Sequence, residues 1–289
     1  MAHPWDVRSG LGDRPHTHEN PAANLLALLL VVLVPTILVA VIAGWRPLDP
    51  AQTDALRRWL SRAPADAAGV QAATPGGRAL PDGWLYPAAG VATGEVRGYA
   101  VTDADGVGIW SAYQRLGGPT YLGYPVSQRF SADGAVLQVF QRGLLRYTNP
   151  DAGVVPVRLL DQLHAAGRDP ELSGHWGVPE LESPVPDQAS PEQVTAWLDA
   201  LAPAHPAIVA YVAGAPDGGA LLGLPTSAVQ DLGSYYAVRF QGGVLQEWKE
   251  DVAWAKAGEV TAANVGEMAV TLGMFPAEPL APAAAPAGA

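Results

Sequence analysis

Five side chains of this sequence have the chemistry that sugar-binding and peptide-binding surfaces use. Four are aromatic and one is an arginine, and all lie in or beside the turns of a repeated phrase: Tyr121, Tyr124, Arg142, Tyr147 and Trp248. An aromatic ring offers a flat apolar face with a polar edge, and a guanidinium offers a rigid fork of donors. We interpret the five as candidate ligand contacts. The alternative is that the rings complete a thin hydrophobic core, and the sequence leaves both interpretations open.

No catalytic pattern accompanies these residues, so we expect a protein that is not an enzyme, has no catalytic residues and holds no cofactor or metal. The sequence contains no G-x-S-x-G, no H-E-x-x-H and no phosphate-binding glycine loop followed by Lys. The acidic turn at 102–108 resembles a calcium loop, but Val101 and Ala112 stand where acidic ligands are needed. The acidic residues within 247–251 favour a solvated strand end over a pair of glycosidase carboxylates. The later histidines lack metal-ligand spacing: His164, His175 and His205.

Charge and composition exclude further classes of function. The chain has 17 basic and 28 acidic residues and a net charge of −11, which argues against a nucleic-acid partner because phosphate binding needs clustered Lys and Arg. The sequence has no cysteine, which excludes disulfides, thiolate metal sites and thiol nucleophiles. Its 32 glycines and 27 prolines favour short strands and many turns over long helices.

One short phrase occurs twice. "LGYPVS" at Leu122–Ser127 precedes "FQRGLL" at Phe140–Leu145, and "LGLPTS" at Leu222–Ser227 precedes "FQGGVL" at Phe240–Leu245. The two copies share eight identities at one offset of 100 residues. Such spacing indicates an internal repeat, in which one supersecondary unit is built twice.

Each copy has the pattern of a small α+β unit. A short apolar helix ends at a Gly-Gly pair, and Asp133-Gly134 suits a two-residue hairpin turn. We predict one short helix packed on a three-stranded antiparallel meander in each unit. Because such a unit buries little surface alone, we expect the two to share a core. Between them, Ser190 and Gln193 predict a capping box that opens a helix.

The stretch "YQRLGGPTYLGYPVSQRFSADGAVLQVFQRGLLRYTNPDAG" resembles a surface module of Chloroflexota proteins and, more distantly, the LGFP repeats of wall-associated proteins. The resemblance is close over 84–163 and weaker over 208–275. It implies a module outside the cytoplasm that accompanies wall or hydrolase domains. The second copy departs from the pattern, because Leu224 replaces Tyr124 and Gly242 replaces Arg142. If these two residues contact a ligand, the second copy has a purely structural role.

The N-terminal part has a separate character. Residues 25–43 include 19 uncharged residues, which matches the thickness of a membrane core and predicts a transmembrane helix over 25–44 in contact with lipid. A cleaved signal peptide is the alternative. The arginines after residue 44 outnumber those before it. Because cytoplasmic loops carry an excess of Lys and Arg, this count would place the C-terminal domain inside the cell. The resemblance, in contrast, implies an extracytoplasmic domain. We expect a single-pass membrane protein with its large C-terminal domain outside.

These observations predict a membrane-anchored extracytoplasmic binding or scaffold protein that contacts cell-wall glycan or peptide. The alternative is an accessory single-helix subunit of a larger membrane complex. Residues 1–24 are predicted to be a disordered head, 25–44 a transmembrane helix, and 45–80 a helix with an Ala/Gly/Pro linker. The first repeat unit covers 81–165, a crossing loop with a helix covers 166–206, and the second repeat unit covers 207–275. Residues 276–289 are predicted to be a disordered Ala/Pro tail.

Overall fold

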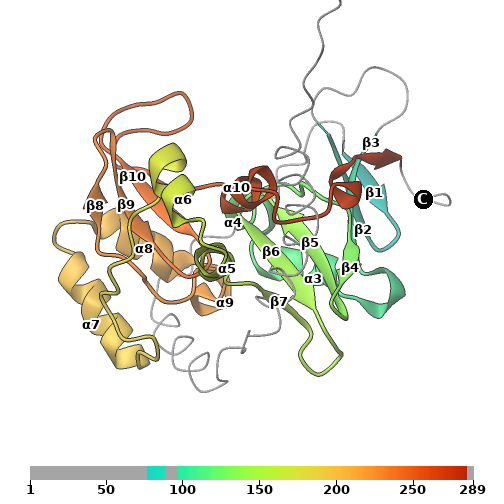
Figure 1. Ribbon diagram of the computed structural model, residues 1–289, viewed down its shortest axis with the longest axis horizontal. Coiled ribbons are helices and arrows are strands. Elements are labelled where there is room, and N and C mark those ends of the chain that lie inside the picture. Colours follow the sequence, from blue (N-terminus) through green and yellow to red (C-terminus); the bar gives the residue numbers. More distant parts are fainter. Residues whose placement is uncertain (1–76, 89–96, 285–289) are drawn as a thin grey trace, which may run out of the picture.

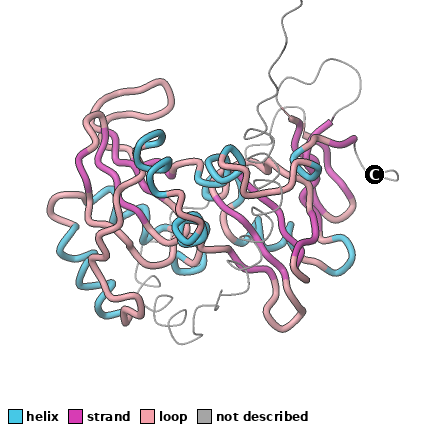
Figure 2. Tube along the Cα trace, viewed as in Figure 1, coloured by secondary structure: helices cyan, strands magenta, loops and turns pink. Residues whose placement is uncertain are grey.

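The computed structural model describes residues 77–88 and 97–284, which fold into three four-stranded antiparallel sheets with short helices between them (Figure 1). The sheets have the strand orders β1-β2-β3-β12, β4-β5-β6-β7 and β11-β10-β9-β8. The strands form groups toward the two ends of the molecule, and several helices lie between them (Figure 2).

The first repeat unit contains two short helices, one sheet and a following helix. Its helices are α3 (Ile109–Arg115) and α4 (Gly118–Tyr121), which are separated by Gly117 in the left-handed conformation. The hairpin turn at Asp133 and Gly134 has positive φ at both residues, as expected for a two-residue turn. The sheet strands and the helix that follows them are β4 (Phe130–Ala132), β5 (Ala135–Phe140), β6 (Gly143–Tyr147), β7 (Val154–Pro156) and α5 (Leu159–Ala165).

The second unit repeats this order. Its elements are α8 (Pro206–Gly214), α9 (Pro216–Gly219), β8 (Gln230–Asp231), β9 (Tyr235–Arg239), β10 (Val244–Trp248), β11 (Val260–Ala262) and α10 (Val265–Thr271). Two helices lie between the units, α6 (Asp169–Trp176) and α7 (Pro191–Leu201). The capping box predicted at Ser190 and Gln193 is confirmed at the start of α7.

The third sheet joins the two ends of the described chain. Its strands are β1 (Arg78–Leu80), β2 (Gly83–Pro87), β3 (Arg97–Thr102) and β12 (Ala283–Ala284), and a single 3-10 turn, η1 (Ala104–Gly106), follows β3. Strand β12 follows a second 3-10 turn, η2 (Glu278–Leu280), and pairs with β3. Strand β1 lies in the segment that the sequence predicted to be a linker, and η2 and β12 lie in the predicted disordered tail. Strands β2 and β3 and the turn η1 lie in the segment predicted to be the first repeat unit.

The predicted fold class is therefore wrong in its architecture. Each unit has a four-stranded sheet, because the chain turns back once more and adds β7 or β11, and the third sheet was not predicted. Strands β7 and β11 have only three residues each and follow polar turns, so their sequences are too short to show a regular alternation of apolar and polar residues. The predicted transmembrane helix at 25–44 lies outside the described residues. Within the part that is described, no helix has the length and apolarity needed to cross a membrane.

The helix that ends each unit packs on the other unit. The N–H groups of Leu160 and Asp161, in α5, donate to the carbonyl of Gln241, and those of Gly266 and Glu267, in α10, donate to the carbonyl of Gln141. In Figure 1, α10 lies beside β6 of the first unit, although it follows the last strand of the second. Gly266 permits the close approach, because a Cβ there would lie 1.8 Å from the carbonyl oxygen of Phe140.

One hydrophobic cluster contains residues from both units and from the exchanged helices. Leu137 and Leu144 of the first sheet lie in the same cluster as Ala237 and Val244 of the second, with at most 2% of each exposed. The members from α5 and α10 are Leu159, Leu160, Leu163, Val265, Met268 and Ala269. Since a buried side chain needs neighbours on all sides, this arrangement makes the two units depend on each other.

Candidate functional site

The residues that the two copies share hold one turn in both units. The side-chain Oε1 of Gln141 accepts from the N–H of Tyr124 at 3.0 Å, and Gln241 accepts from the N–H of Leu224 at the same distance. Gly123 and its counterpart both have φ of 72°, and a Cβ on Gly123 would lie 2.7 Å from the side chain of Gln141. The repeated phrase is thus explained by backbone geometry, so functional differences should lie where the copies differ.

Tyr124 is one such difference, and it is exposed on the surface. Forty per cent of the residue is accessible to solvent. Its ring lies 5.7 Å from the ring of Tyr86, which in turn lies 5.9 Å from the ring of the buried Tyr113. An exposed ring with two further rings behind it has little freedom left to lose when a ligand binds.

Arg142 is the second difference between the copies. Its Nη1 donates to the carbonyl of Thr120 at 2.6 Å, which fixes the guanidinium beside the turn, whereas its buried Nε has no hydrogen-bond partner in the structure. The positive charge also reaches two tyrosines. Burial raises the pKa of Tyr113 and raises that of Tyr211 to about 12, and in both cases Arg142 opposes the rise.

Tyr121 connects this region to the second unit. Its hydroxyl donates to the carbonyl of Gly214 at 2.9 Å, and its ring lies 5.4 Å from that of Tyr211 in α8. The structure therefore brings three of the five predicted site residues to one part of the surface. We name this group, with the two tyrosines behind it, the tyrosine edge: Tyr86, Tyr113, Tyr121, Tyr124 and Arg142.

The other two predicted residues lie in the packing of their own sheets. Tyr147 pairs with Val136 across β5 and β6 and packs against the cluster around Tyr113. Trp248 is 8% exposed, and its indole N–H donates to the Oγ1 of Thr261 at 2.9 Å. For Trp248 the core interpretation fits the structure.

Sequence reasoning missed Trp254, which lies in the loop between β10 and β11. Seventy per cent of this residue is exposed, and its ring lies 5.6 Å from that of Trp248. The loop is longer than its counterpart in the first unit, so the offset between equivalent residues grows from 100 before the loop to 106 after it. That change of offset is the signal from which the loop could have been found.

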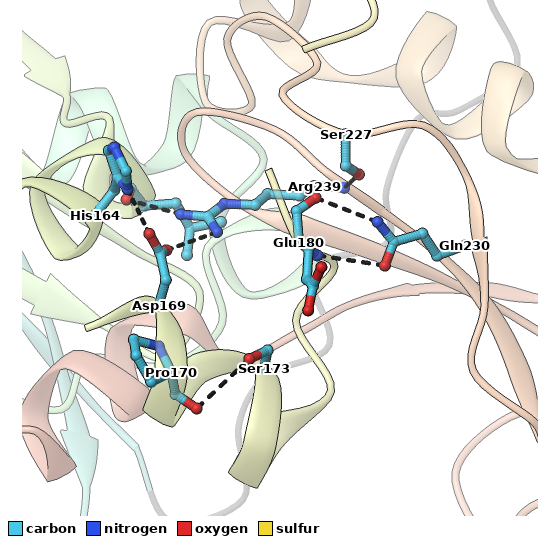
Figure 3. A network of polar contacts seen from close by, with 9 residues as sticks. His164, Asp169, Pro170, Ser173, Glu180, Ser227, Gln230 and Arg239 are labelled. Carbon is cyan, nitrogen blue, oxygen red and sulfur yellow. Dashed lines mark hydrogen bonds and ion pairs between the residues drawn. The ribbon is translucent and has the colours of Figure 1, made fainter. Parts of the chain in front are cut away.

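A buried arginine marks a third difference between the copies. Arg239 is 2% exposed and occupies the position that Val139 has in the first unit. Its Nη1 lies 2.8 Å from Oδ1 of Asp169 (Figure 3). The other carboxylate oxygen of Asp169, Oδ2, contacts the imidazole of His164. Burial opposes ionisation of Asp169, but hydrogen bonds from His164 and Arg239 outweigh it and lower the pKa of this carboxyl.

The carboxyl of Asp161 lies in the same polar network. Burial raises its pKa from 3.8 to about 6, although Arg158, Arg239 and His164 all favour the charged form, and Asp187 adds to the rise. Within residues 77–88 and 97–284, no group of three His, Asp or Glu side chains could hold a metal ion.

We predict that Asp161→Asn stabilises the protein at neutral pH. Between about pH 4 and pH 6 the carboxyl of Asp161 keeps its proton in the folded state but has lost it in the unfolded state. The free energy of unfolding therefore falls as pH rises through that window, because the folded state must hold an ionised carboxylate above it. The melting temperature of the variant should exceed that of the wild type at pH 7.5, and the difference should shrink toward pH 4. An equal difference at both pH values would contradict this assignment.

Comparison with known proteins gives no further guide to the site. The sequence matches no protein-family model, and no curated protein is significantly similar to it. The resemblance to surface modules with LGFP-like repeats therefore stays a prediction.

Proposed function

We propose that this protein is an extracytoplasmic binding and scaffold protein of the cell envelope, and that the tyrosine edge is its contact with cell-wall polymer. The observation that carries the proposal is the difference between the two copies of one turn. Unit 2 builds the same turn with Leu224 and Gly242, so the fold of the turn does not require Tyr124 or Arg142. Side chains that a turn does not need, and that remain partly exposed, are free to serve binding.

The chemistry of the tyrosine edge suits a wall polymer. The face of Tyr124 offers an apolar surface to a sugar ring, and its hydroxyl supplies a polar contact at the edge. Arg142 adds a fixed positive charge, which favours the carboxylates of wall sugars and of their peptide stems. The contact of Arg142 with the carbonyl of Thr120 holds the guanidinium in place before any ligand arrives.

Cosedimentation with purified wall material tests this proposal. We expect the wild-type chain to bind saturably, and Tyr124→Leu and Arg142→Ala each to weaken binding by about tenfold or more, which corresponds to about 1.4 kcal/mol. Tyr124→Leu installs the residue that unit 2 already uses, so its melting temperature should stay close to that of the wild type.

Two variants serve as controls for this experiment. Leu224→Ala changes the equivalent position in unit 2, and Arg129→Ala removes an arginine that pairs with Asp105 away from the shared turn. Both should bind like the wild type. If the wild type does not sediment, or if the controls lose binding as much as the tyrosine-edge variants, the proposal is wrong, and a subunit of a membrane complex becomes the better hypothesis.

A further inference from the structure

The C-terminal segment lies against the third sheet as a bound peptide would. Turn η2 places Pro279 in a buried position, and β12 then pairs with β3 through Ala283 and Ala284. Figure 1 shows this segment, in dark red, beside strands from the opposite end of the described chain. The segment "EPLAPAA" at 278–284 contains only proline, alanine, one leucine and one acidic residue.

The protein contacts four successive carbonyl groups of this segment. The backbone N–H of Gln128 donates to the carbonyl of Pro279 at 2.7 Å, and the hydroxyl of Tyr99 donates to that of Leu280 at 2.9 Å. The side-chain Nε2 of Gln128 reaches the carbonyl of Ala281 at 3.3 Å. The guanidinium of Arg97 donates to the carbonyl of Pro282, from Nη2 at 3.1 Å and from Nε at 3.3 Å.

This row of donors matches the chemistry of a proline-containing peptide. Proline has no N–H and keeps a carbonyl, so a segment with prolines at positions 279 and 282 presents more acceptors than donors. Arg97 and Tyr99 come from β3, and Gln128 comes from the approach to β4. Because these three residues bind backbone carbonyls, they set the path of the peptide without contacting most of its side chains. The buried Pro279 is the exception.

We propose that Arg97, Tyr99 and Gln128 form a binding site for an Ala/Pro-rich segment of another protein, and that the chain's own segment 278–284 occupies this site in cis. The site lies outside the tyrosine edge, so the inference goes beyond the proposed function and does not depend on it. A tethered segment competes at a high effective concentration, of millimolar order for a short linker. A partner peptide therefore binds well only when the segment has been released or removed.

Binding of a labelled synthetic peptide tests the proposal. The probe has the sequence of residues 276–284, "PAEPLAPAA", and the receptor is the chain ending at Phe275. We expect saturable binding with one peptide per chain, and binding to the full-length chain that is at least about tenfold weaker. A Gly/Ser peptide of equal length should not bind. Absence of binding by a truncated chain that is folded, or equal binding of the Gly/Ser peptide, would overturn the proposal.

A conservative variant connects the binding to the site. Tyr99→Phe removes only the hydroxyl that donates to the carbonyl of Leu280, and one hydrogen bond contributes about 0.5–1.5 kcal/mol. We therefore expect the truncated chain to bind the peptide about two- to tenfold more weakly with this change. Tyr236→Phe, which alters a tyrosine of β9 in the second unit, should leave the affinity unchanged. An equal effect of both variants would place the peptide elsewhere and contradict the assignment.

A second design applies if the truncated chain does not fold. A protease site inserted after Pro276 allows the segment to be cut in the folded protein, so that it is held only by its contacts. A hundredfold excess of labelled peptide should then exchange with the cut segment and remain with the protein on gel filtration. If no label is taken up, or if the uncut chain forms a dimer by exchanging this segment between two copies, the proposed site for a partner peptide is wrong.

Discussion

Replacing either repeated phenylalanine by alanine is expected to destabilise the whole described domain by about 3–5 kcal/mol. Phe140 is completely buried, and its ring is stacked 4.8 Å from that of Tyr113. Phe240 is 2% exposed, and its ring lies 6.1 Å from that of Trp197. Each residue lies in the core cluster of its own unit, but the exchanged helices connect the units, so we expect one unfolding transition in both variants.

Calorimetry or chemical denaturation followed by two probes measures this effect. Both variants should lower the midpoint of a single transition that stays coincident for fluorescence and circular dichroism. Trp254→Ala is the matched control, because this exposed side chain has one ring contact, with Trp248, and its loss should change stability by only about 1 kcal/mol. Two transitions, with only one displaced in each variant, would show that the units fold independently and would contradict the shared core.

Removing the partner of the buried arginine is expected to have the second large effect. Asp169→Ala leaves the guanidinium of Arg239 buried without its carboxylate, and we expect a loss of about 3 kcal/mol, the lower end of the range for a broken buried pair. The lower end applies because the side chain of Asp169 is 32% exposed and Asp161 lies in the same network.

Arg239→Val serves as the test of that explanation, because the first unit has Val139 at the equivalent position. The N–H groups of both residues donate to the Oγ of an equivalent serine at 2.9 Å, so the backbone accepts either side chain. The single change should cost about 1 kcal/mol or less, and Asp169→Ala combined with it should be clearly more stable than Asp169→Ala alone. If the double variant is as unstable as Asp169→Ala, the buried charge is not the cause of the loss.

The sequence predicted the elements whose patterns are local. The helices at the start of each unit, the hairpin turn at Asp133-Gly134 and the capping box at Ser190 follow from residue types at fixed spacing. The identities between the copies also have a local cause, because Gly123, Gln141 and Ser127 are each required by the backbone of one turn.

Features that depend on distant contacts were not predicted. The exchange of α5 and α10 is invisible in the sequence, because Leu160 and Gly266 reveal no relation until the backbone bonds to Gln241 and Gln141 are known. Strand β12 has two alanines and gains its structure from β3, so its composition alone indicates disorder. From the sequence, a charged residue in a strand, such as Arg239, is expected to be exposed. Its burial is explained only by the position of Asp169.

The sequence predicts those members of the candidate site that lie beside the repeated turn, and it does not predict those that depend on distant contacts. Tyr124 and Arg142 were found because the second copy lacks them, and Tyr121 because it lies beside the repeated turn. The tyrosines behind them were missed, since the contact of Tyr86 with Tyr124 joins the third sheet to the first unit. The sequence leaves Trp248 open as a ligand contact or a core residue, because its hydrogen bond to Thr261 depends on the pairing between β10 and β11.

The central claim is that the tyrosine edge contacts wall polymer. Residue-resolved NMR during titration with solubilised wall fragments tests this claim most directly. We expect saturable shifts of the ring signals of Tyr124 and the side-chain signals of Arg142, with no comparable shifts at Leu224 and Gly242 in the equivalent turn. Shifts that are equal at both turns, shifts confined to other surfaces such as the loop of Trp254, or no shifts at all would contradict it.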